Sequence, residues 1–258
     1  MKTQDALNRR TYDWPLEDQS IPLLSVTTIC DTLHDRGLEY VRNKMIATEA
    51  VTDEGWQDLS DESAIQYLAG AANRIREDAA DRGTRLHKLI EDQIVHDIKA
   101  DIEWYEDIES SHVEAAQNFI HHYYLLPEEH GVELPIANLD EKYAGTVDLL
   151  CKSRAGQLWC IDWKTGKKIG RSAALQITAL SHATHYYYNG RSVPLSQPID
   201  RKVVVKLQDN GDWRAYFPKN EDRLWTYFKH LVVLAYWDKY HTDTVGELFH
   251  PSVGRPKQ

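Results

Sequence analysis

The chain has 258 residues, 42% of them hydrophobic and 27% charged, so it can form one large domain or a core with a helical appendage. Its formal net charge of −10 argues against a protein that coats nucleic acid nonspecifically, because such proteins need a broad basic surface. A site that acts on nucleic acid is still compatible with this charge if its cationic side chains are local.

The cysteines and the apolar segments indicate in which compartment the protein is expected. The three cysteines have no paired spacing, which is typical of thiols in a reducing environment. The first ten residues lack the apolar segment of a secretory signal, and the longest apolar run, 231–237, is far shorter than the ~20 residues that cross a bilayer. We therefore expect a soluble, cytoplasmic protein without membrane contact.

The first 130 residues are expected to be mainly helical. Residues 33–50 and 61–80 repeat apolar side chains at helical spacing, which indicates two helices. A glycine interrupts the second pattern, and Thr84 after it is a suitable N-cap for a new helix. On that helix His87 and Glu91, four residues apart, share one side.

The pattern then changes from helix to strand. Ser111 and Glu114 form a capping-box spacing, which predicts a helix that begins at Ser111 and that a proline at position 127 ends. Alternating and apolar segments follow at 132–139, 143–151 and 157–164, and these predict three strands.

Two aspartates and a lysine lie on the last two of these strands. A hairpin closed about Ala155 places Asp148 directly opposite Asp162, and Lys164 points the same way as Asp162 because strand side chains alternate. Opposed Cβ atoms are roughly 4.5–5.5 Å apart, where two like charges are destabilising unless something separates them. A divalent cation is the obvious separator.

The D-x-K spacing alone carries little information. It also occurs at Asp97, Asp140 and Asp200, and the alternative interpretation of Asp162 and Lys164 is a surface hairpin with a solvated ion pair. Context favours the metal site, because only Asp162 ends a strongly apolar strand and has a partner acid on the adjacent strand.

A basic turn follows the acids. Lys167, Lys168 and Arg171 lead into a predicted helix at 172–188, which carries Gln176 one turn from its start. The three cations lie where a phosphodiester bound at the acids would pass. The alternative for each is a solvated turn or helix surface.

The remaining sequence predicts a hairpin, a helix and a tail. Strands at 201–208 and 212–217 meet at an Asn-Gly pair, which favours a type I′ turn. A last helix spans about 220–239, and the residues after it contain two prolines and a glycine.

The order of four features along the chain resembles the PD-(D/E)xK nuclease superfamily. These features are His87, the GTVD segment at 145–148, the DWK segment at 162–164 and Gln176. The likeness is greatest to the RecB-like exonuclease branch found in phages and recombination enzymes, and it covers roughly residues 83–180. The chain departs from the pattern at Val147, where the superfamily has its proline, and at Leu180, where the branch often has an aromatic residue.

The resemblance implies a fold and a chemistry. The fold is α/β, with a PD-(D/E)xK restriction-endonuclease-like core, a mixed central sheet flanked by helices, and a helical N-terminal region. The activity is metal-dependent DNA exonuclease hydrolysis of phosphodiester bonds in phage or bacterial recombination, repair or replication. The cofactor is Mg²⁺ or Mn²⁺, and the iron–sulfur cluster of some members is not expected, since only Cys30, Cys151 and Cys160 are present and none follows the glutamine helix.

The resemblance also assigns roles to residues. The catalytic residues are Asp148, Asp162, Lys164 and Gln176; the metal ligands are His87, Asp148, Asp162 and the carbonyl of Trp163. From their positive charge, we expect Lys167, Lys168, Arg171 and Arg85 to bind DNA. Glu91 and Glu141 are candidates for supporting positions around the metal. Besides the DNA substrate, the resemblance allows a single-strand annealing or recombination partner protein and an oligomer.

We expect three regions: a helical N-terminal region at 1–82, the nuclease core at 83–240 and a tail at 241–258. Two rivals stay open at this point, a nucleic-acid-binding protein that keeps the fold without chemistry and a metal-dependent hydrolase with another substrate. Neither cleavage polarity, nor strand preference, nor the number of metal ions follows from the residues.

Overall fold

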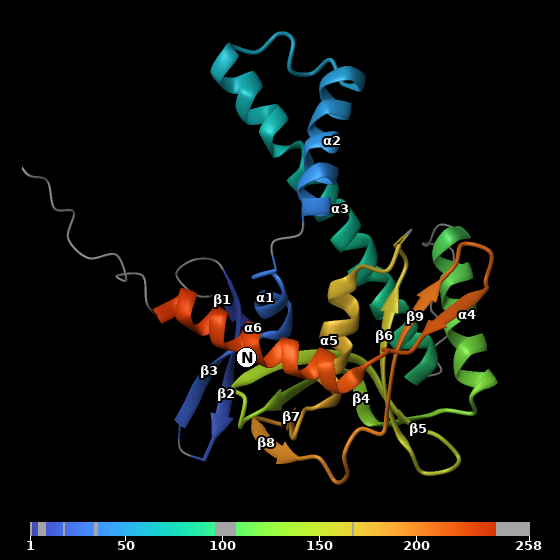
Figure 1. Ribbon diagram of the computed structural model, residues 1–258. Coiled ribbons are helices and arrows are strands. Elements are labelled where there is room, and N and C mark those ends of the chain that lie inside the picture. Colours follow the sequence, from blue (N-terminus) through green and yellow to red (C-terminus); the bar gives the residue numbers. More distant parts are fainter. Residues whose placement is uncertain are drawn as a thin grey trace, which may run out of the picture.

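A computed structural model of the chain describes residues 2–4, 9–17, 19–33, 36–95, 107–166 and 168–240 (Figure 1). The strands are β1 (Lys2–Gln4), β2 (Arg10–Leu16), β3 (Gln19–Ser25), β4 (Leu126–Asn138), β5 (Tyr143–Lys152), β6 (Leu158–Lys164), β7 (His185–Tyr188), β8 (Arg191–Pro194), β9 (Arg201–Leu207) and β10 (Trp213–Tyr216). The helices are α1 (Val26–Cys30), α2 (Arg36–Thr52), α3 (Asp61–Val95), α4 (Asp107–His122), α5 (Arg171–Ser181) and α6 (Glu221–Tyr240).

The described strands form one mixed sheet. At its centre β5 pairs antiparallel with β4 and with β6, and β6 pairs parallel with β9, so α5 and the β7–β8 hairpin lie in the connection between two parallel neighbours. The N-terminal hairpin β2–β3 joins the same sheet through a short parallel pairing of β3 with the start of β5. The expected α/β class, with a mixed sheet flanked by helices, is confirmed.

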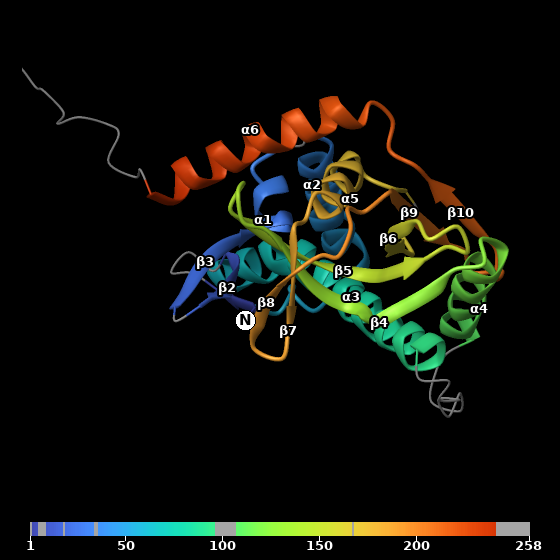
Figure 2. The same ribbon diagram turned by 90° about the horizontal axis from the view of Figure 1, so that it is seen from below.

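Helices cover both faces of the sheet (Figure 2). On one face α1, α5 and α6 pack against alternate residues of β5 and β6, such as Leu150 and Cys160. On the other face α3 and α4 pack against the intervening residues, such as Leu149, Ile161 and Trp163. This alternation fixes which strand residues face each helical layer.

The β5–β6 hairpin has the register that the sequence predicts. Leu149 pairs with Ile161 and Lys152 with Leu158, which centres the hairpin on Ala155. The turn closes through a hydrogen bond from the Ser153 N–H to the Gln157 carbonyl (3.0 Å). Asp148 and Asp162 therefore occupy facing positions at the point where the ladder ends.

The largest departure from the predictions is at the N-terminus. The sequence predicts no strand before residue 131, yet β1, β2 and β3 lie there. Pro15 and Pro22 within β2 and β3 weaken the local strand signal, because proline cannot donate to a ladder. The predicted boundary at 82–83 falls inside α3, and the predicted tail at 241–258 lies outside the described residues.

Three predicted helix boundaries are wrong. No helix begins at Thr84, because α3 is continuous from Asp61 to Val95 and tolerates the glycine before Thr84. The helix expected from Ser111 to the proline at 127 begins at Asp107 and ends at His122.

The third wrong boundary is the end of the helix expected over 172–188, because helix α5 ends at Ser181. Residues 185–188 form strand β7, whose three consecutive tyrosines suit a strand better than a helix.

The turn between β9 and β10 also differs from the prediction. Gly211 has a positive φ of 79°, but Asn210 does not, so this is not a type I′ turn. The Gly211 N–H donates to the Gln208 carbonyl (3.1 Å), and the Gln208 N–H donates to the Asp212 carbonyl (2.9 Å). A three-residue loop that ends in a left-handed glycine has this pattern.

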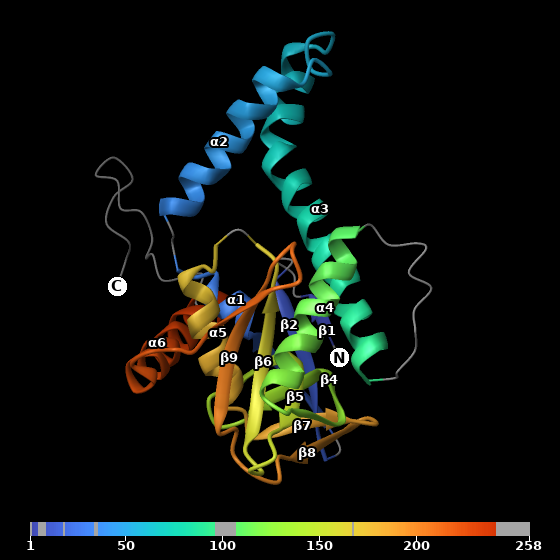
Figure 3. The ribbon, with the colours of Figure 1, turned by 90° about the vertical axis from the view of Figure 1, so that its right-hand side faces the viewer.

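Helices α2 and α3 form an antiparallel arm that projects from the sheet (Figures 1 and 3). Arg74 ties the two helices together, since its guanidinium donates to the Glu49 carboxylate (2.7 Å) and to the Tyr67 carbonyl (2.9 Å). The base of the arm, which is the C-terminal half of α3, packs on the sheet and carries His87. Within the described residues, no helix combines the length and the apolar character that a membrane span requires.

Candidate active site

A cavity of about 440 Å³ opens where β5 and β6 diverge, between α1, α3 and α5. Five of the residues singled out from the sequence line it: His87, Asp148, Asp162, Lys164 and Gln176. They come from α3, β5, β6 and α5, so residues 89 positions apart in the chain meet in one space. The fold thus brings these five side chains together.

Asp148 crosses from β5 to the backbone of β6. Its Oδ2 accepts a hydrogen bond from the Trp163 N–H (2.7 Å), in place of the ladder bond that would otherwise continue past Leu149 and Ile161. The carboxylate is thereby fixed beside Asp162, with its Oδ1 directed toward His87 (3.6 Å to Nδ1).

Asp162 and Lys164 are paired, as expected of neighbours on one strand face. Lys164 Nζ donates to Asp162 Oδ1 (2.8 Å), and the Asp162 side chain is only 11% exposed. The second oxygen, Asp162 Oδ2, is buried and has no hydrogen-bond partner among the described residues. A buried carboxylate oxygen without a donor is costly unless a cation or an ordered water meets it.

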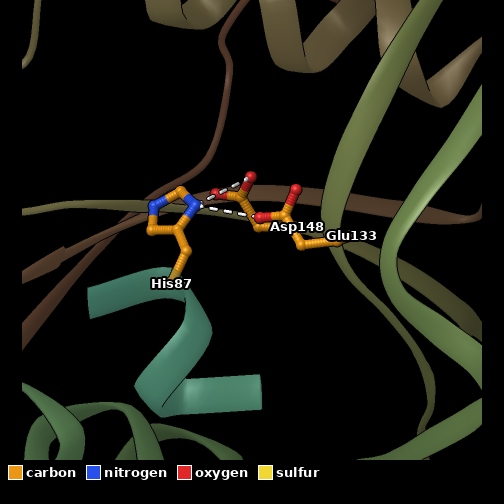
Figure 4. A group of neighbouring side chains, drawn as sticks. All are labelled: His87, Glu133 and Asp148. Atoms are coloured by element: carbon orange, nitrogen blue, oxygen red, sulfur yellow. Dashed lines mark hydrogen bonds and ion pairs between the residues drawn. The ribbon is translucent and has the colours of Figure 1, made fainter. Parts of the chain in front are cut away.

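A third carboxylate, Glu133 on β4, completes the group. Its Oε1 lies 3.1 Å from His87 Nδ1, and one ligand atom from each of His87, Glu133 and Asp148 lies within 4.8 Å of the others (Figure 4). In the β4–β5 register, Leu134 pairs with Val147 and Val132 with Leu149, so Glu133 stands opposite Asp148. Glu133, Asp148 and Asp162 therefore occupy facing positions on three adjacent strands.

The sequence contained the signal for Glu133. A hairpin closed about the 139–142 turn places it opposite Asp148 by the same reasoning that places Asp162 there. The supporting candidate Glu141 instead lies in that turn, where its N–H donates to Asn138 Oδ1 (2.9 Å), and it does not line the cavity. The side chain of Glu91 lies outside the described residues.

Burial and crowding change how Asp148 titrates. Burial, the largest cause, and the negative charge of Asp162 together raise its pKa to about 7, against the opposing effects of His87 and Lys164. Burial and a neighbouring carboxylate both disfavour the charged form of a carboxyl group. The site therefore holds a proton easily when no cation is bound.

Burial acts on the pKa values of the two basic groups in the opposite sense, but neighbouring carboxylates raise both values overall. Burial lowers the pKa of His87, but the hydrogen bond to Glu133 and the charge of Asp148 outweigh it and leave the pKa raised. Burial also lowers the pKa of Lys164, and attraction to Asp162 and Asp148 again leaves the net value above normal. Lys164 is therefore a cation beside the carboxylates.

The other predicted site residues lie further out. Trp163 is buried against Phe119 and contributes its N–H to Asp148, while a ligand role for its carbonyl stays a prediction. Lys168, Arg171 and Arg85 are exposed and do not line the cavity, and Lys167 lies outside the described residues. Their part in DNA binding stays a prediction.

Three cationic side chains that the sequence did not single out do line the cavity. They are Lys2 on β1, Arg10 on β2 and Lys88 on α3. Lys88 follows His87 directly and could have been suspected. Lys2 and Arg10 reach the site only because the N-terminal strands join the sheet, for which no local pattern gives a signal.

No protein-family model matches the chain, and a search of curated proteins finds no match either.

Proposed function

We propose that the protein is a divalent-cation-dependent nuclease that hydrolyses phosphodiester bonds of DNA. The observation that carries the proposal is the convergence of Glu133, Asp148 and Asp162 in one cavity, beside His87 and Lys164. A binding protein has no need to gather three carboxylates next to the place where a phosphate would lie.

The residues fit a small divalent cation. Carboxylate oxygens are the ligands that Mg²⁺ and Mn²⁺ prefer, and Mn²⁺ also accepts imidazole nitrogen. Asp162 Oδ2 offers a buried oxygen without a donor, and His87, Glu133 and Asp148 offer a compact set of further atoms. A cation bound here would activate a water and offset negative charge on the phosphate.

The chain's own side chains supply the remaining steps. Lys164, held by Asp162, is placed to stabilise negative charge that develops on a phosphate oxygen. Gln176 on α5 faces the same cavity and can orient the attacking water or a phosphate oxygen through its amide. Lys2, Arg10 and Lys88 would hold the polyanion in the cavity through its phosphates.

The order of the central strands supports a place in the PD-(D/E)xK superfamily as part of this proposal. A helix, three strands that include the hairpin carrying both acids, a helix that carries a glutamine and then further strands make up the order that the resemblance implies. The RecB-like branch and a role in DNA recombination or repair belong to the same proposal.

The test is magnesium-dependent cleavage of labelled DNA by the protein and four variants. Asp162→Asn and Lys164→Ala are expected to lower the rate by at least about a hundredfold, the usual scale for removal of one charge-stabilising group. Asp140→Asn and Lys142→Ala are matched controls, because they belong to a tripeptide of the same spacing whose two charged ends are exposed in a turn.

The controls are expected to cleave at the parent rate, and a chelator should stop every reaction. Folding of each variant is checked by circular dichroism and thermal unfolding. Parent-level cleavage by either Asp162→Asn or Lys164→Ala would show that these groups are not the catalytic ones.

A further inference from the structure

A second hollow adjoins the active-site cavity. It has a volume of about 720 Å³ and is lined by residues of the N-terminal strands, α1 and the C-terminal part of α6. We call it the groove, and it is lined by Gln4, Arg9, Arg10, Thr27, Thr28, Asp31, Thr32, Leu234, Trp237 and Asp238. Arg10 and Thr27 line both the cavity and the groove, so the two spaces share a wall.

We propose that the groove binds the single-stranded DNA that leads away from the scissile phosphate, with one base stacked on Trp237. This inference rests on the proposed function, which supplies the strand at the shared wall. A strand held by its phosphate at Asp162 and Lys164 would pass Arg10 and Thr27, which line both spaces, on its way to α6.

The apolar part of the groove fits an unpaired base. The Trp237 side chain is 49% exposed and Leu234 is 53% exposed, one helical turn apart on α6. An exposed indole can stack on any base, because every base has a π-face. In a duplex the base faces are already stacked on one another, so a duplex gains nothing from this surface.

The polar part of the groove fits a backbone but adds little net charge. Arg9 pairs with Asp238 (2.7 Å), which fixes the β2 side of the groove to α6. Arg10 and Asp31 contribute opposite charges, so the four ionised groups balance. The Thr28 hydroxyl donates to the Arg10 carbonyl (2.9 Å), and this bond holds α1 against β2 and keeps the shared wall in place. Affinity in the groove should therefore come mainly from stacking.

Binding of a fluorescein-labelled 12-nucleotide single strand, measured by anisotropy with Mg²⁺, tests the groove. The measurements use the Asp162→Asn background so that the probe is not cut. Trp237→Ala is expected to weaken binding about fivefold or more, the lower end of the range for one stacked base. Trp237→Phe keeps an aromatic face and should retain most of the affinity.

Tyr227→Ala is the matched control, since Tyr227 is a 53% exposed aromatic residue on the same helix that does not line the groove. It should bind as the parent does. The ratio of the parent and Trp237→Ala affinities should also stay constant as salt is raised, because stacking releases no counterions.

Two results would overturn the groove assignment: equal binding by Trp237→Ala and Tyr227→Ala, or an equal loss for the single strand and for a blunt duplex of the same sequence. Hydrolysis is judged separately, by incubating the parent protein with the same 12-mer and Mg²⁺. If the parent binds through Trp237 but never cleaves, the nuclease proposal fails and the groove stands as a binding site. If the parent cleaves the 12-mer and Trp237→Ala leaves the affinity unchanged, the groove proposal alone fails.

Discussion

Asp148 lies among two further carboxylates, a histidine and a lysine, and this crowding determines how the site responds to pH. In the folded protein its pKa is about 7, well above the ordinary value of 3.8, and the pKa of His87 is also raised. Asp148 therefore binds more protons in the folded than in the unfolded chain between about pH 4 and pH 7, and His87 does so around and above its ordinary pKa of 6.5. Stability falls with rising pH wherever the folded state binds more protons.

The first prediction is that the cation-free protein is less stable at pH 8 than at pH 5.5, and that a divalent cation removes much of the difference. At pH 8 the Asp148 carboxylate is ionised without full compensation, and Mn²⁺ or Mg²⁺ offsets the repulsion. At pH 5.5 a proton occupies the site, and the cation must displace it. The measurement is the midpoint of thermal unfolding at both pH values, once with about 5 mM cation and once with chelator. This concentration suits a cation that binds near the millimolar range.

The expected result is a larger cation-induced rise in the midpoint at pH 8 than at pH 5.5. Glu133→Gln should reduce that rise, because it removes one charged oxygen from the group while keeping its shape. A rise that is equal at both pH values would show that the cation does not compete with protons at Asp148.

Gly145 controls how closely two helices pack on the sheet beside the cavity. It lies in β5, and a Cβ at this position would approach Leu180 Cδ2 to 2.5 Å and Val26 Cγ2 to 3.2 Å. The absence of a side chain therefore lets α1 and α5 pack closely on β5, next to the cavity that all three line. The glycine of the GTVD segment has a packing reason in this chain.

The second prediction concerns this close approach. Gly145→Ala should lower the free energy of unfolding by about 1–3 kcal/mol, because the added methyl group overpacks a core in which Leu180 is only 6% exposed. Combining it with Leu180→Ala should cost less than the sum of the two single changes, since the second change makes room for the first. Chemical denaturation of the three variants measures this coupling, and strict additivity would contradict the packing argument.

Elements joined by short turns were predictable, because their pairing is encoded locally. The alternation of 158–164 and the turn about Ala155 were enough to place Asp148 opposite Asp162. Glu133 could have been found in the same way across the 139–142 turn.

The pairing of β3 with β5 could not be predicted, because it joins residues more than 115 positions apart and has no local pattern. Lys2 and Arg10 reach the site only through that pairing, so these cations were missed. The helix that was expected to stop before Thr84 shows a different limit: a single glycine lowers helix propensity by only about 1 kcal/mol, and packing on the sheet outweighs it.

The long helix α3 connects the arm with the cavity of the candidate site. Its 35 residues extend about 50 Å at 1.5 Å per residue, from the tip of the arm to the side of the active-site cavity. One end pairs with α2 through Arg74, and the other carries His87 and Lys88. The arm and the site are thus joined by one continuous helix.

The distribution of charge over the whole molecule leads to the last prediction. The net charge is −10, yet Lys2, Arg10, Lys88 and Lys164 line one cavity. Lys164 is already paired with Asp162, which leaves about three cations to meet phosphates. Each neutralised phosphate of a single strand contributes about −0.7 to the slope of log K against log salt. The slope for single-stranded DNA should therefore be about −2, shallow for a protein that binds nucleic acid.

Fluorescence anisotropy between about 50 and 200 mM salt, the range over which such slopes are resolved, measures it in the Asp162→Asn background. Lys88→Gln should reduce the slope by about 0.7, because it removes one phosphate contact without altering the acids. Lys168→Gln is the informative comparison, since Lys168 is exposed on the basic turn and does not line the cavity. If DNA is held by the cavity alone, this change leaves the slope as it is. A slope steeper than about −4, reduced by Lys168→Gln, would instead place the main contacts on the basic turn, because only a longer track of cations could release so many counterions.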